Sequence, residues 1–316
     1  MSGILALLHP RPQLRYAGRM PNPSWTPPAD SGITIRWQQA NGLTFEVAEA
    51  GVGDRLALCL HGFPELNFSW RFQIPLLVER GWRVWAPNLR GYGATDRPEG
   101  IAAYHMDRLL EDVGALIDAS GAREVMLIAH DWGAIIAWQF AIRKIRPLVK
   151  LVIMNVPHPL CFKRELRKAA QLRASWYVFF FQLPWIPEWA FRRNNARMIR
   201  AAFKGMAVDK SRFPREVLDI YAAAACRPGA MTAMINYYRS AFWSGSNFAE
   251  TDGCVDVPVL MVWGEEDTAL TIGCVDGTDA YCRDFQLHRL PGVSHWVQQE
   301  APEKVNAILG DWLDRG

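Results

Sequence analysis

Five short, almost wholly apolar runs constrain the fold of this chain more than any other feature. Each has four or five residues and lacks the polar alternation of a strand with one wet face, which is typical of parallel strands buried on both faces. Two earlier strands, Ile33–Gln38 and Thr44–Ala48, are expected to pair as a hairpin through Asn41-Gly42, a strong turn signal. The five runs are Leu56–Leu60, Arg83–Ala86, Val125–Ala129, Leu151–Met154 and Val259–Trp263.

Helical patterns lie between these runs. Apolar residues repeat at helical spacing from Met106 to Ile117, and the repeat stops before Gly121, a residue type that commonly ends helices. The same spacing returns near the C-terminus, from Val305 to Trp312. Short buried strands that alternate with helices predict an α/β fold, with a mostly parallel sheet flanked by helices.

Two departures from this alternation indicate the domain organisation. The first 30 residues contain six prolines and no periodicity, so we expect an irregular arm over residues 1–32. Residues 157–246 have no clear strand, and "REVLDIYAAAA" and "GAMTAMINYYRSAF" within them have helical patterns, which predicts an all-helical cap inserted into the core domain. The expected core domain comprises residues 33–156 and 247–316.

Composition excludes several classes of protein. Half of the 316 residues are hydrophobic and 21% are charged, as in a globular protein. No apolar run approaches the roughly 20 residues of a membrane span, and the apolar start from Met1 to Leu8 is too short for a signal peptide. The six cysteines show no C-x-x-C spacing, so we expect free thiols in a cytoplasmic protein.

The charge is unevenly distributed. A formal net charge of +3 is too small to indicate nucleic-acid binding. Between Cys161 and Arg215, however, 13 Lys and Arg residues stand against three acids, Glu165, Glu188 and Asp209. We favour a solvated basic surface without stable membrane association; a patch for an anionic membrane or an acidic partner is the alternative.

The stretch "LIAHDWGAIIAW" places Asp131 in an unusual position. An apolar strand ends at His130-Asp131, and a helical pattern begins directly afterwards. In the G-x-S-x-G elbow of many hydrolases, a nucleophilic serine occupies the middle of such a strand–turn–helix, between small residues like Ala129 and Gly133. Asp131 is therefore a candidate nucleophile, although aspartate is also a favoured N-cap of a helix.

Three further segments supply candidate partners. In "LHGFPE", which follows another strand, the N–H of Phe63 is a candidate oxyanion donor together with that of Trp132. "WGEED" offers Asp267, which we prefer to Glu265 and Glu266 as the acid, and "GVSHWVQQE" offers His295. The order nucleophile, acid, histidine is that of the α/β-hydrolase triad.

These segments resemble the α/β-hydrolases, and specifically the soluble epoxide hydrolases. The resemblance runs from about Ile33 to the C-terminus and rests on "HGFPE", "HDWG", "GYGATDRP", "NVPHP", "GEED" and "GVSHWVQQEAPEKVN". The first two are shared with haloalkane dehalogenases. The resemblance implies an α/β-hydrolase fold, with Asp131 as nucleophile, His295 as general base and Asp267 orienting the histidine.

Two tyrosines of the cap match the family's pattern for activating an epoxide oxygen. Tyr177 lies in "SWYVFFFQLP" and Tyr238 in "NYYR". The resemblance implies that both are acids for the ring oxygen, whereas a core aromatic is the ordinary alternative for each. The aromatic segment from Trp176 to Phe191 predicts a hydrophobic substrate. The side chains expected in the substrate pocket are Trp132, Phe63, Trp176, Phe180 and Trp296.

The implied reaction converts a hydrophobic aryl or alkyl epoxide into a vicinal diol through an ester on Asp131, with water and without cofactor or metal. A haloalkane or haloacid dehalogenase would use the same Asp131, His295 and Asp267 but would have no use for the tyrosine pair. Haloacetate dehalogenases usually have arginine where this chain has Trp132. A ligand-binding relative without catalysis is a further alternative, and a homodimer is left open.

Overall fold

The computed structural model describes residues 21–244 and 252–315. Most of the predicted arm, residues 1–20, lies outside these ranges, as does the predicted boundary between cap and core at residues 246 and 247. The described part of the arm has no regular structure, but it is attached to the core: the buried Trp25 donates from Nε1 to Asn67 Oδ1 at 2.8 Å, and Ser24 Oγ donates to Glu46 Oε2 at 2.6 Å.

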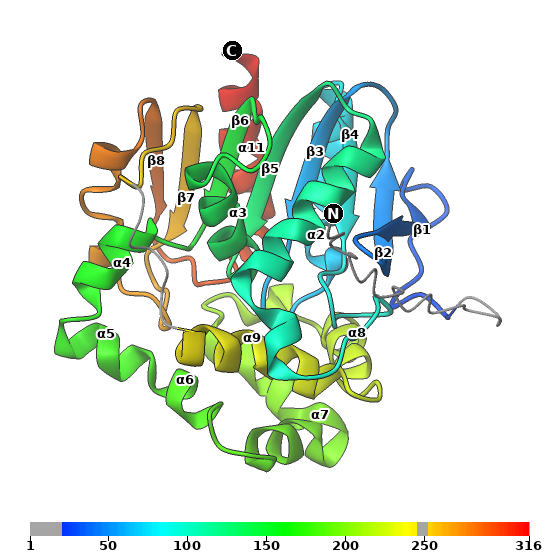
Figure 1. The fold of residues 1–316 in the computed structure, drawn as a ribbon, viewed down its shortest axis with the longest axis vertical. Coiled ribbons are helices and arrows are strands. Elements are labelled where there is room, and N and C mark those ends of the chain that lie inside the picture. The colour runs from blue at the N-terminus through cyan, green and yellow to red at the C-terminus, as the bar shows by residue number, and fades with distance from the viewer. Residues whose placement is uncertain (1–20, 245–251, 316) are drawn as a thin grey trace, which may run out of the picture.

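In the described part of the chain, eight strands form one sheet in the order β1-β2-β4-β3-β5-β6-β7-β8. The pairs β1–β2 and β2–β4 are antiparallel, and all other neighbours are parallel, as expected for an α/β-hydrolase fold (Figure 1). The strands are β1 Thr34–Ala40, β2 Leu43–Ala50, β3 Arg55–Leu60, β4 Arg83–Pro87, β5 Glu124–His130, β6 Lys150–Met154, β7 Val259–Gly264 and β8 Phe285–Leu290.

Helices flank this sheet and gather at one end of it (Figure 1). The α-helices are α1 Gln73–Glu79, α2 Met106–Ser120, α3 Trp132–Ile142, α4 Pro159–Glu165, α5 Ala169–Ala174, α6 Trp176–Phe180, α7 Ile186–Met206, α8 Arg215–Ala225, α9 Ala230–Ser244, α10 Val297–Glu300 and α11 Pro302–Asp314. Short 3₁₀ helices span Asn67–Trp70, Ile101–Tyr104, Lys210–Arg212, Ile272–Val275 and Thr278–Tyr281.

The sequence predicted seven of these strands and missed β8. Its sequence, FQLHRL, alternates apolar with polar residues, and its side chains are mostly half-buried because β8 is an edge strand with one neighbour. No wholly apolar run marks this strand in the sequence. The hairpin turn is confirmed: Asn41 and Gly42 both have positive φ, 48° and 74°, between the paired residues Ala40 and Leu43.

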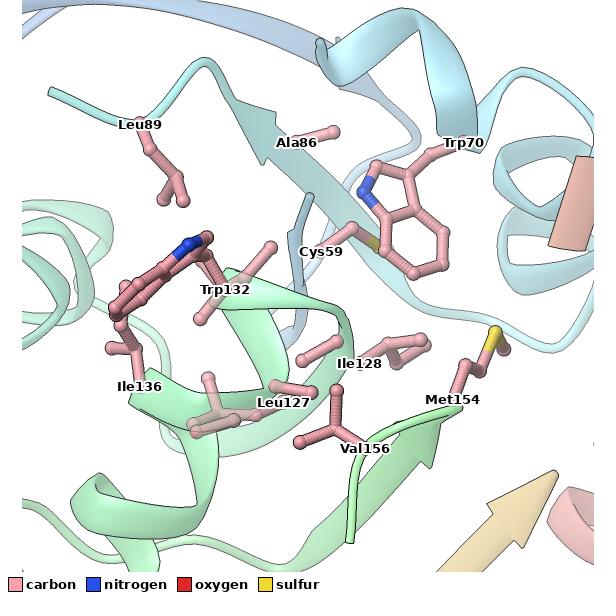
Figure 2. Packing of buried hydrophobic residues seen from close by; sticks show 14 of the residues in the cluster. Cys59, Trp70, Ala86, Leu89, Leu127, Ile128, Trp132, Ile136, Met154 and Val156 are labelled. Carbon is pink, nitrogen blue, oxygen red and sulfur yellow. The ribbon is translucent and has the colours of Figure 1, made fainter. Parts of the chain in front are cut away.

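The hydrophobic core lies on both faces of the central strands. Leu127 and Ile128 of β5 are fully buried, and α3, which carries Trp132 and Ile136, packs beside this strand (Figure 2). Ten of the eleven α3 residues are buried, so this helix is apolar all round rather than amphipathic. The residue before this helix is consequently held by rigid, close-packed elements on both sides.

Helices α4 to α9 lie between β6 and β7 in the chain and form the cap. The two helices predicted there are confirmed as α8 and α9. Helix α7 is interrupted at residues 193–196, where Asn194, Asn195 and Ala196 have positive φ. In Figure 1, α9 lies next to the sheet, and α6 and α7 lie on the far side of α9.

Candidate active site

Asp131 occupies a sharp turn between β5 and α3. Its φ is +48° and its ψ is −124°, and its side chain makes no hydrogen bond that would cap α3. The N-cap explanation for this aspartate is therefore wrong, and the carboxylate is presented away from the helix. The turn depends on glycines nearby: a Cβ on Gly62 would lie 2.2 Å from Asp131 Oδ1, and one on Gly133 would lie 2.2 Å from the carbonyl oxygen of Leu60.

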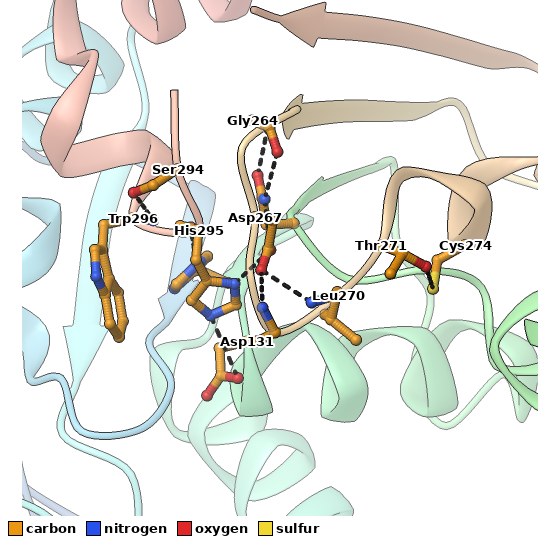
Figure 3. A network of polar contacts seen from close by, with 12 residues as sticks. Asp131, Gly264, Asp267, Leu270, Thr271, Cys274, Ser294, His295 and Trp296 are labelled. Carbon is orange, nitrogen blue, oxygen red and sulfur yellow. Dashed lines mark hydrogen bonds and ion pairs between the residues drawn. The ribbon is translucent and has the colours of Figure 1, made fainter. Parts of the chain in front are cut away.

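The structure brings His295 and Asp267 to this carboxylate. His295 Nδ1 contacts Asp267 Oδ2 at 2.7 Å, and His295 Nε2 lies 3.7 Å from Asp131 Oδ2 (Figure 3). Asp267 is buried, whereas Glu266 is exposed and Glu265 is half-buried. The three groups predicted from chain order thus form one contiguous array, with the histidine between two carboxylates.

Both oxygens of Asp267 are held by hydrogen bonds from neutral donors. Oδ1 accepts from the N–H groups of Ala269 and Leu270 at 2.8 and 2.9 Å, and Oδ2 accepts from Asn155 Nδ2 at 2.8 Å. Asn155, at the end of β6, also bonds Gly264 through both ends of its amide. Asn155 thus holds the carboxylate of Asp267 in place.

The charges of this array shift the pKa values of its members. Burial lowers the pKa of His295, but the carboxylates of Asp267 and Asp131 outweigh burial and raise the pKa to about 10. Burial raises the pKa of Asp267, but attraction to His295 and the hydrogen bonds of Asp267 hold it below its usual range. The two carboxylates therefore favour the protonated form of His295 in the free enzyme.

One of the two expected oxyanion donors contacts the nucleophile. The N–H of Phe63 donates to Asp131 Oδ1 at 2.5 Å. The N–H of Trp132 begins α3 beside the same carboxylate but forms no cap hydrogen bond with it. An oxyanion at the acyl carbon of Asp131 would form within reach of the loop that carries Phe63.

A buried polar network lies behind the nucleophile. His130 Nδ1 contacts Glu65 Oε2 at 2.7 Å, and its Nε2 donates to the carbonyl oxygen of His295 at 2.8 Å. Glu65 Oε1 accepts from the amides of Gln298 and Gln299 at 2.9 and 2.7 Å. The network joins the strand before Asp131 to the loop that carries His295, and so fixes their relative position.

Sequence analysis missed this network, although its members stand inside the quoted motifs. Glu65 ends "HGFPE", His130 begins "HDWG", and the two glutamines lie in "HWVQQE". Burial raises the pKa of Glu65, but attraction to His130 and His61 and hydrogen bonds outweigh it and lower the pKa to about 2. Two signals for the network were present in the sequence. Glu65 is a polar residue close to a glycine turn, and His130 is a polar residue next to the candidate nucleophile.

A cavity of about 440 Å³ opens above Asp131 and is lined mainly by apolar side chains. Asp131 and Trp132 form part of its floor, and Tyr177 and Tyr238 line it from the cap. Tyr237 also lines it, while its hydroxyl donates to the carbonyl oxygen of Arg90 at 2.9 Å. A hydrophobic molecule in this cavity would meet a carboxylate on one side and two phenols on the other.

Aromatic rings hold the two cap tyrosines. The rings of Tyr177 and Tyr238 lie 5.9 Å apart and nearly perpendicular, and Tyr238 also packs against Phe63, Trp132 and Phe181. Burial first, and then the charge of Asp131, raises the pKa of both tyrosines above the usual value. Both hydroxyls consequently keep their protons at neutral pH and can donate them.

The predicted substrate pocket requires correction. Of its five side chains, Trp132 alone lines the cavity. Trp176 is 62% exposed, because α6 turns Tyr177 and Val178 toward the cavity instead. The remaining three lie elsewhere: Phe180 packs against the ring of Phe181, Phe63 packs among cap aromatics, and Trp296 lies against His295 and Phe203.

Within residues 21–244 and 252–315, no three His, Cys, Asp or Glu side chains cluster as metal ligands would. The helices in these ranges include none that is both long and apolar enough to cross a membrane.

Comparison with known proteins agrees with the fold and with the motifs. The α/beta hydrolase fold family model matches residues 58–302. The chain is 38% identical to an AB hydrolase superfamily protein, YfhM, of Bacillus subtilis over 89% of this chain and 98% of that protein. It is 37% identical to human epoxide hydrolase 4 over 86% of this chain and 76% of that protein.

Solved structures give the same result. A mutant of the Bacillus megaterium epoxide hydrolase, complexed with its product (R)-3-[1]naphthyloxy-propane-1,2-diol, aligns with a TM-score of 0.81 and 30% identity. The alignment covers 88% of this chain and all of that one (100%). The nucleophile elbow and the sheet order agree with these relatives. The chain therefore belongs to the α/β-hydrolase fold family and, within it, to the epoxide hydrolases.

Proposed function

We propose that this epoxide hydrolase opens a hydrophobic epoxide in two steps, through a covalent ester on Asp131. The observation that carries the proposal is the position of Asp131, which faces His295 on one side and shares a cavity with Tyr177 and Tyr238. A carboxylate suits an alkyl electrophile because aspartate, with a reference pKa of about 3.9, is already ionised at neutral pH.

In the first step, Asp131 attacks one ring carbon while the bond from that carbon to the ring oxygen breaks. Oδ1 is engaged by the N–H of Phe63, which leaves Oδ2 as the attacking atom. The ring oxygen becomes an alkoxide, and Tyr177 and Tyr238 donate hydrogen bonds and then a proton to it. The product of this step is a hydroxyalkyl ester of Asp131.

In the second step, His295 takes a proton from water, and the water oxygen attacks the acyl carbon of Asp131. The ester itself prepares this step. Asp131 loses its negative charge on alkylation, and with it one of the two carboxylates that raise the pKa of His295. The pKa of the histidine should then fall toward neutrality, where it can act as a base. The N–H groups of Phe63 and Trp132 stabilise the resulting oxyanion.

The oxyanion collapses as the bond between the acyl carbon and the ester oxygen breaks; the ester oxygen takes a proton from His295 and leaves in the diol, and Asp131 ionises again. The proton that His295 released when its pKa fell restores the tyrosine hydroxyl.

The substrate class follows from the cavity. Its lining is mainly apolar, and aromatic side chains surround the two tyrosines. The similar Bacillus megaterium enzyme has an aryl ether diol as its product. We therefore propose epoxides with an aryl or alkyl substituent as substrates, and vicinal diols as products, with no cofactor or metal.

The dehalogenase alternative would use Asp131, His295 and Asp267 in the same way. It gives no role to two phenols that face the nucleophile across the cavity. A non-catalytic ligand-binding role gives none to the His295–Asp267 contact at 2.7 Å. Diol formation from an aryl epoxide, set against halide release from a bromoalkane, separates all three.

The mechanism is tested by a single turnover in heavy-oxygen water. Because water attacks the acyl carbon, the diol should receive an unlabelled oxygen from Asp131, and the label should remain in the enzyme. His295→Gln should allow alkylation but block hydrolysis, so intact-protein mass should rise by one substrate. A labelled diol in the first turnover, with no mass increase in the His295 variant, would contradict the ester mechanism.

A further inference from the structure

The outer side of the cap exposes an unusual number of large apolar side chains. We define the cap face by six of them, which lie from α5 to the start of α7. Leu172, Trp176 and Phe179 lie on α5 and α6, Leu183 and Trp185 lie in the turn between α6 and α7, and Trp189 lies in the first turn of α7. The six are Leu172, Trp176, Phe179, Leu183, Trp185 and Trp189.

The rings of this face are far more exposed than side chains of their size usually are. Trp185 is 81% exposed and Trp189 is 60% exposed. Single exposed apolar residues are ordinary on protein surfaces, but a group of large ones exposed along one short segment indicates an interaction surface. Tryptophan in particular is favoured where a polar and an apolar phase meet.

The exposed charges within the segment that carries the cap face have one sign, and the first exposed acid after it is Asp209. Every exposed charged side chain from residue 161 to residue 208 is basic. Two acids in this range are withdrawn from the surface: Glu165 is buried, and Glu188 is paired with Arg239 at 2.6 Å. The exposed basic residues are Lys163, Arg164, Arg167, Lys168, Arg173, Arg192, Arg193, Arg197 and Lys204.

Basic and aromatic groups are in direct contact on this surface. The guanidinium of Arg193 lies 4.9 Å from the centre of the Trp189 ring. Sequence analysis favoured a purely solvated basic surface, because it could not show that the aromatic residues among these charges are exposed. A helical surface with aromatic residues on its apolar side and Lys and Arg around them is the pattern of interfacial membrane binding.

We propose that the cap face docks the protein on an anionic lipid bilayer. The rings would enter the headgroup region, and the surrounding cations would meet acidic headgroups. A second copy of this chain fits this face poorly, since a two-fold contact would place the same basic surface against itself. The charge complementarity thus selects lipid over self-association.

The cap face adjoins the cavity. The Phe179 ring lies 6.0 Å from that of Phe242, which lines the cavity, as does Val178 beside it. If the proposed function holds, docking would bring the cavity near the phase in which hydrophobic epoxides dissolve. The docking itself does not depend on that function and is tested without substrate.

The test is co-sedimentation of the full chain with vesicles of phosphatidylcholine, with and without phosphatidylserine. We expect binding to the mixed vesicles that salt weakens. Arg192→Gln with Arg193→Gln should weaken partitioning roughly 30-fold, and Trp185→Ser with Trp189→Ser at least about 10-fold. All four residues are exposed, so folding should persist, as circular dichroism will show.

A matched control removes two exposed arginines from the other end of the strands. Arg123→Gln with Arg283→Gln makes the same change in net charge and should bind vesicles like the unaltered protein. The proposal is overturned if the unaltered protein stays in the supernatant, or if the control pair weakens binding as much as the cap pair. A lipid-free dimer in sedimentation velocity that the tryptophan substitutions dissociate would also overturn it, in favour of self-association.

Discussion

The two sides of the cavity are held in place by different kinds of interaction. On the core side, directional hydrogen bonds orient the charged groups: Phe63 N–H on Asp131, His295 on Asp267, and Asn155 on Asp267. On the cap side, Tyr177 and Tyr238 are held largely by aromatic ring contacts at 4.7 to 6.0 Å, with interplanar angles from 56° to 84°. Hydrogen bonds fix distances and angles, whereas aromatic packing allows small rotations at low cost.

This difference fits the proposed division of labour. In the proposed mechanism, the core side acts on the acyl carbon of Asp131, whose position is the same for every substrate, so rigid groups serve it well. The cap side meets a ring oxygen whose position changes with the substrate. Two donors in an adaptable aromatic setting can reach that oxygen in more than one pose. Substitutions on the two sides should therefore fail in different ways.

Loss of the nucleophile should break the core side completely. Asp131→Ala removes the carboxylate that forms the ester in the proposed mechanism, and we expect diol formation to fall at least about 10⁴-fold. The cavity should persist, so the variant should still bind a hydrophobic diol, measured by calorimetry. Substantial residual turnover with unchanged affinity would mean that water attacks the epoxide directly.

Loss of both phenols should break the cap side. Tyr177→Phe with Tyr238→Phe should slow alkylation about 10³-fold or more, and each single change by roughly 10- to 100-fold, since one donor can partly serve for two. Stopped-flow measurement of ester formation checks this. Tyr281→Phe removes a hydroxyl from a tyrosine that stacks on His158, away from the cavity lining, and provides the control. A double variant with near-normal rates would favour the dehalogenase alternative.

Much of the fold could be predicted because its central strands are buried on both faces, and so are apolar without interruption. β8 escaped this rule because an edge strand has a half-exposed face, which allows residues such as His288 and Arg289. The interruption of α7 was also invisible. Asn194 and Asn195 tolerate positive φ, but nothing local requires it, and the buried Ala196 adopts it against its preference.

The sequence predicted which residues lie close together where the order of the strands decides it. It did not predict which residues line the cavity where the direction of a side chain decides it. Asp131, His295 and Asp267 follow strands whose carboxyl ends meet at one edge of the sheet, so proximity could be inferred. Trp176 and Tyr177 are neighbours in the sequence, yet one faces solvent and the other the cavity. A helix of five residues offers too little periodicity to decide between them.

Raising the pH should affect the core side of the cavity and not the cap side, because His295, which loses a proton, lies on the core side. The pKa of His295 is about 10 in the folded protein against 6.5 for an unperturbed histidine. Because the pKa is higher in the folded protein, protonated His295 stabilises the fold. This stabilisation is complete below pH 6.5 and is lost as the pH rises toward 10. We expect the free energy of unfolding to fall by about 1 to 5 kcal/mol over this window. Urea unfolding measures it.

The control for this pH effect is His295→Gln, which lacks the titrating group. Its free energy of unfolding should change less between pH 6.5 and 10 than that of the unaltered protein. Tyr177→Phe with Tyr238→Phe should retain the unaltered pH dependence in the same window, because buried tyrosines with raised pKa values do not ionise there. Parallel curves for all three proteins would refute a protonated His295 in the free enzyme.

The smallest predicted effect tests whether an uncharged donor matters to the core side. Asn155→Ala removes the hydrogen bond to Asp267 Oδ2 and should raise the pKa of Asp267, at a cost of about 1 to 3 kcal/mol in stability. Because Asp267 acts through His295, ester hydrolysis should slow about 10-fold while alkylation stays nearly unchanged. Single-turnover kinetics separate the two steps. Asn155 has φ +48°, so Asn155→Gly removes the same donor without backbone strain and should give the same split. If both variants slowed alkylation and ester hydrolysis equally, Asn155 would serve only the general packing of the elbow. The directional hydrogen bonds behind the triad would then not distinguish the core side from the cap side.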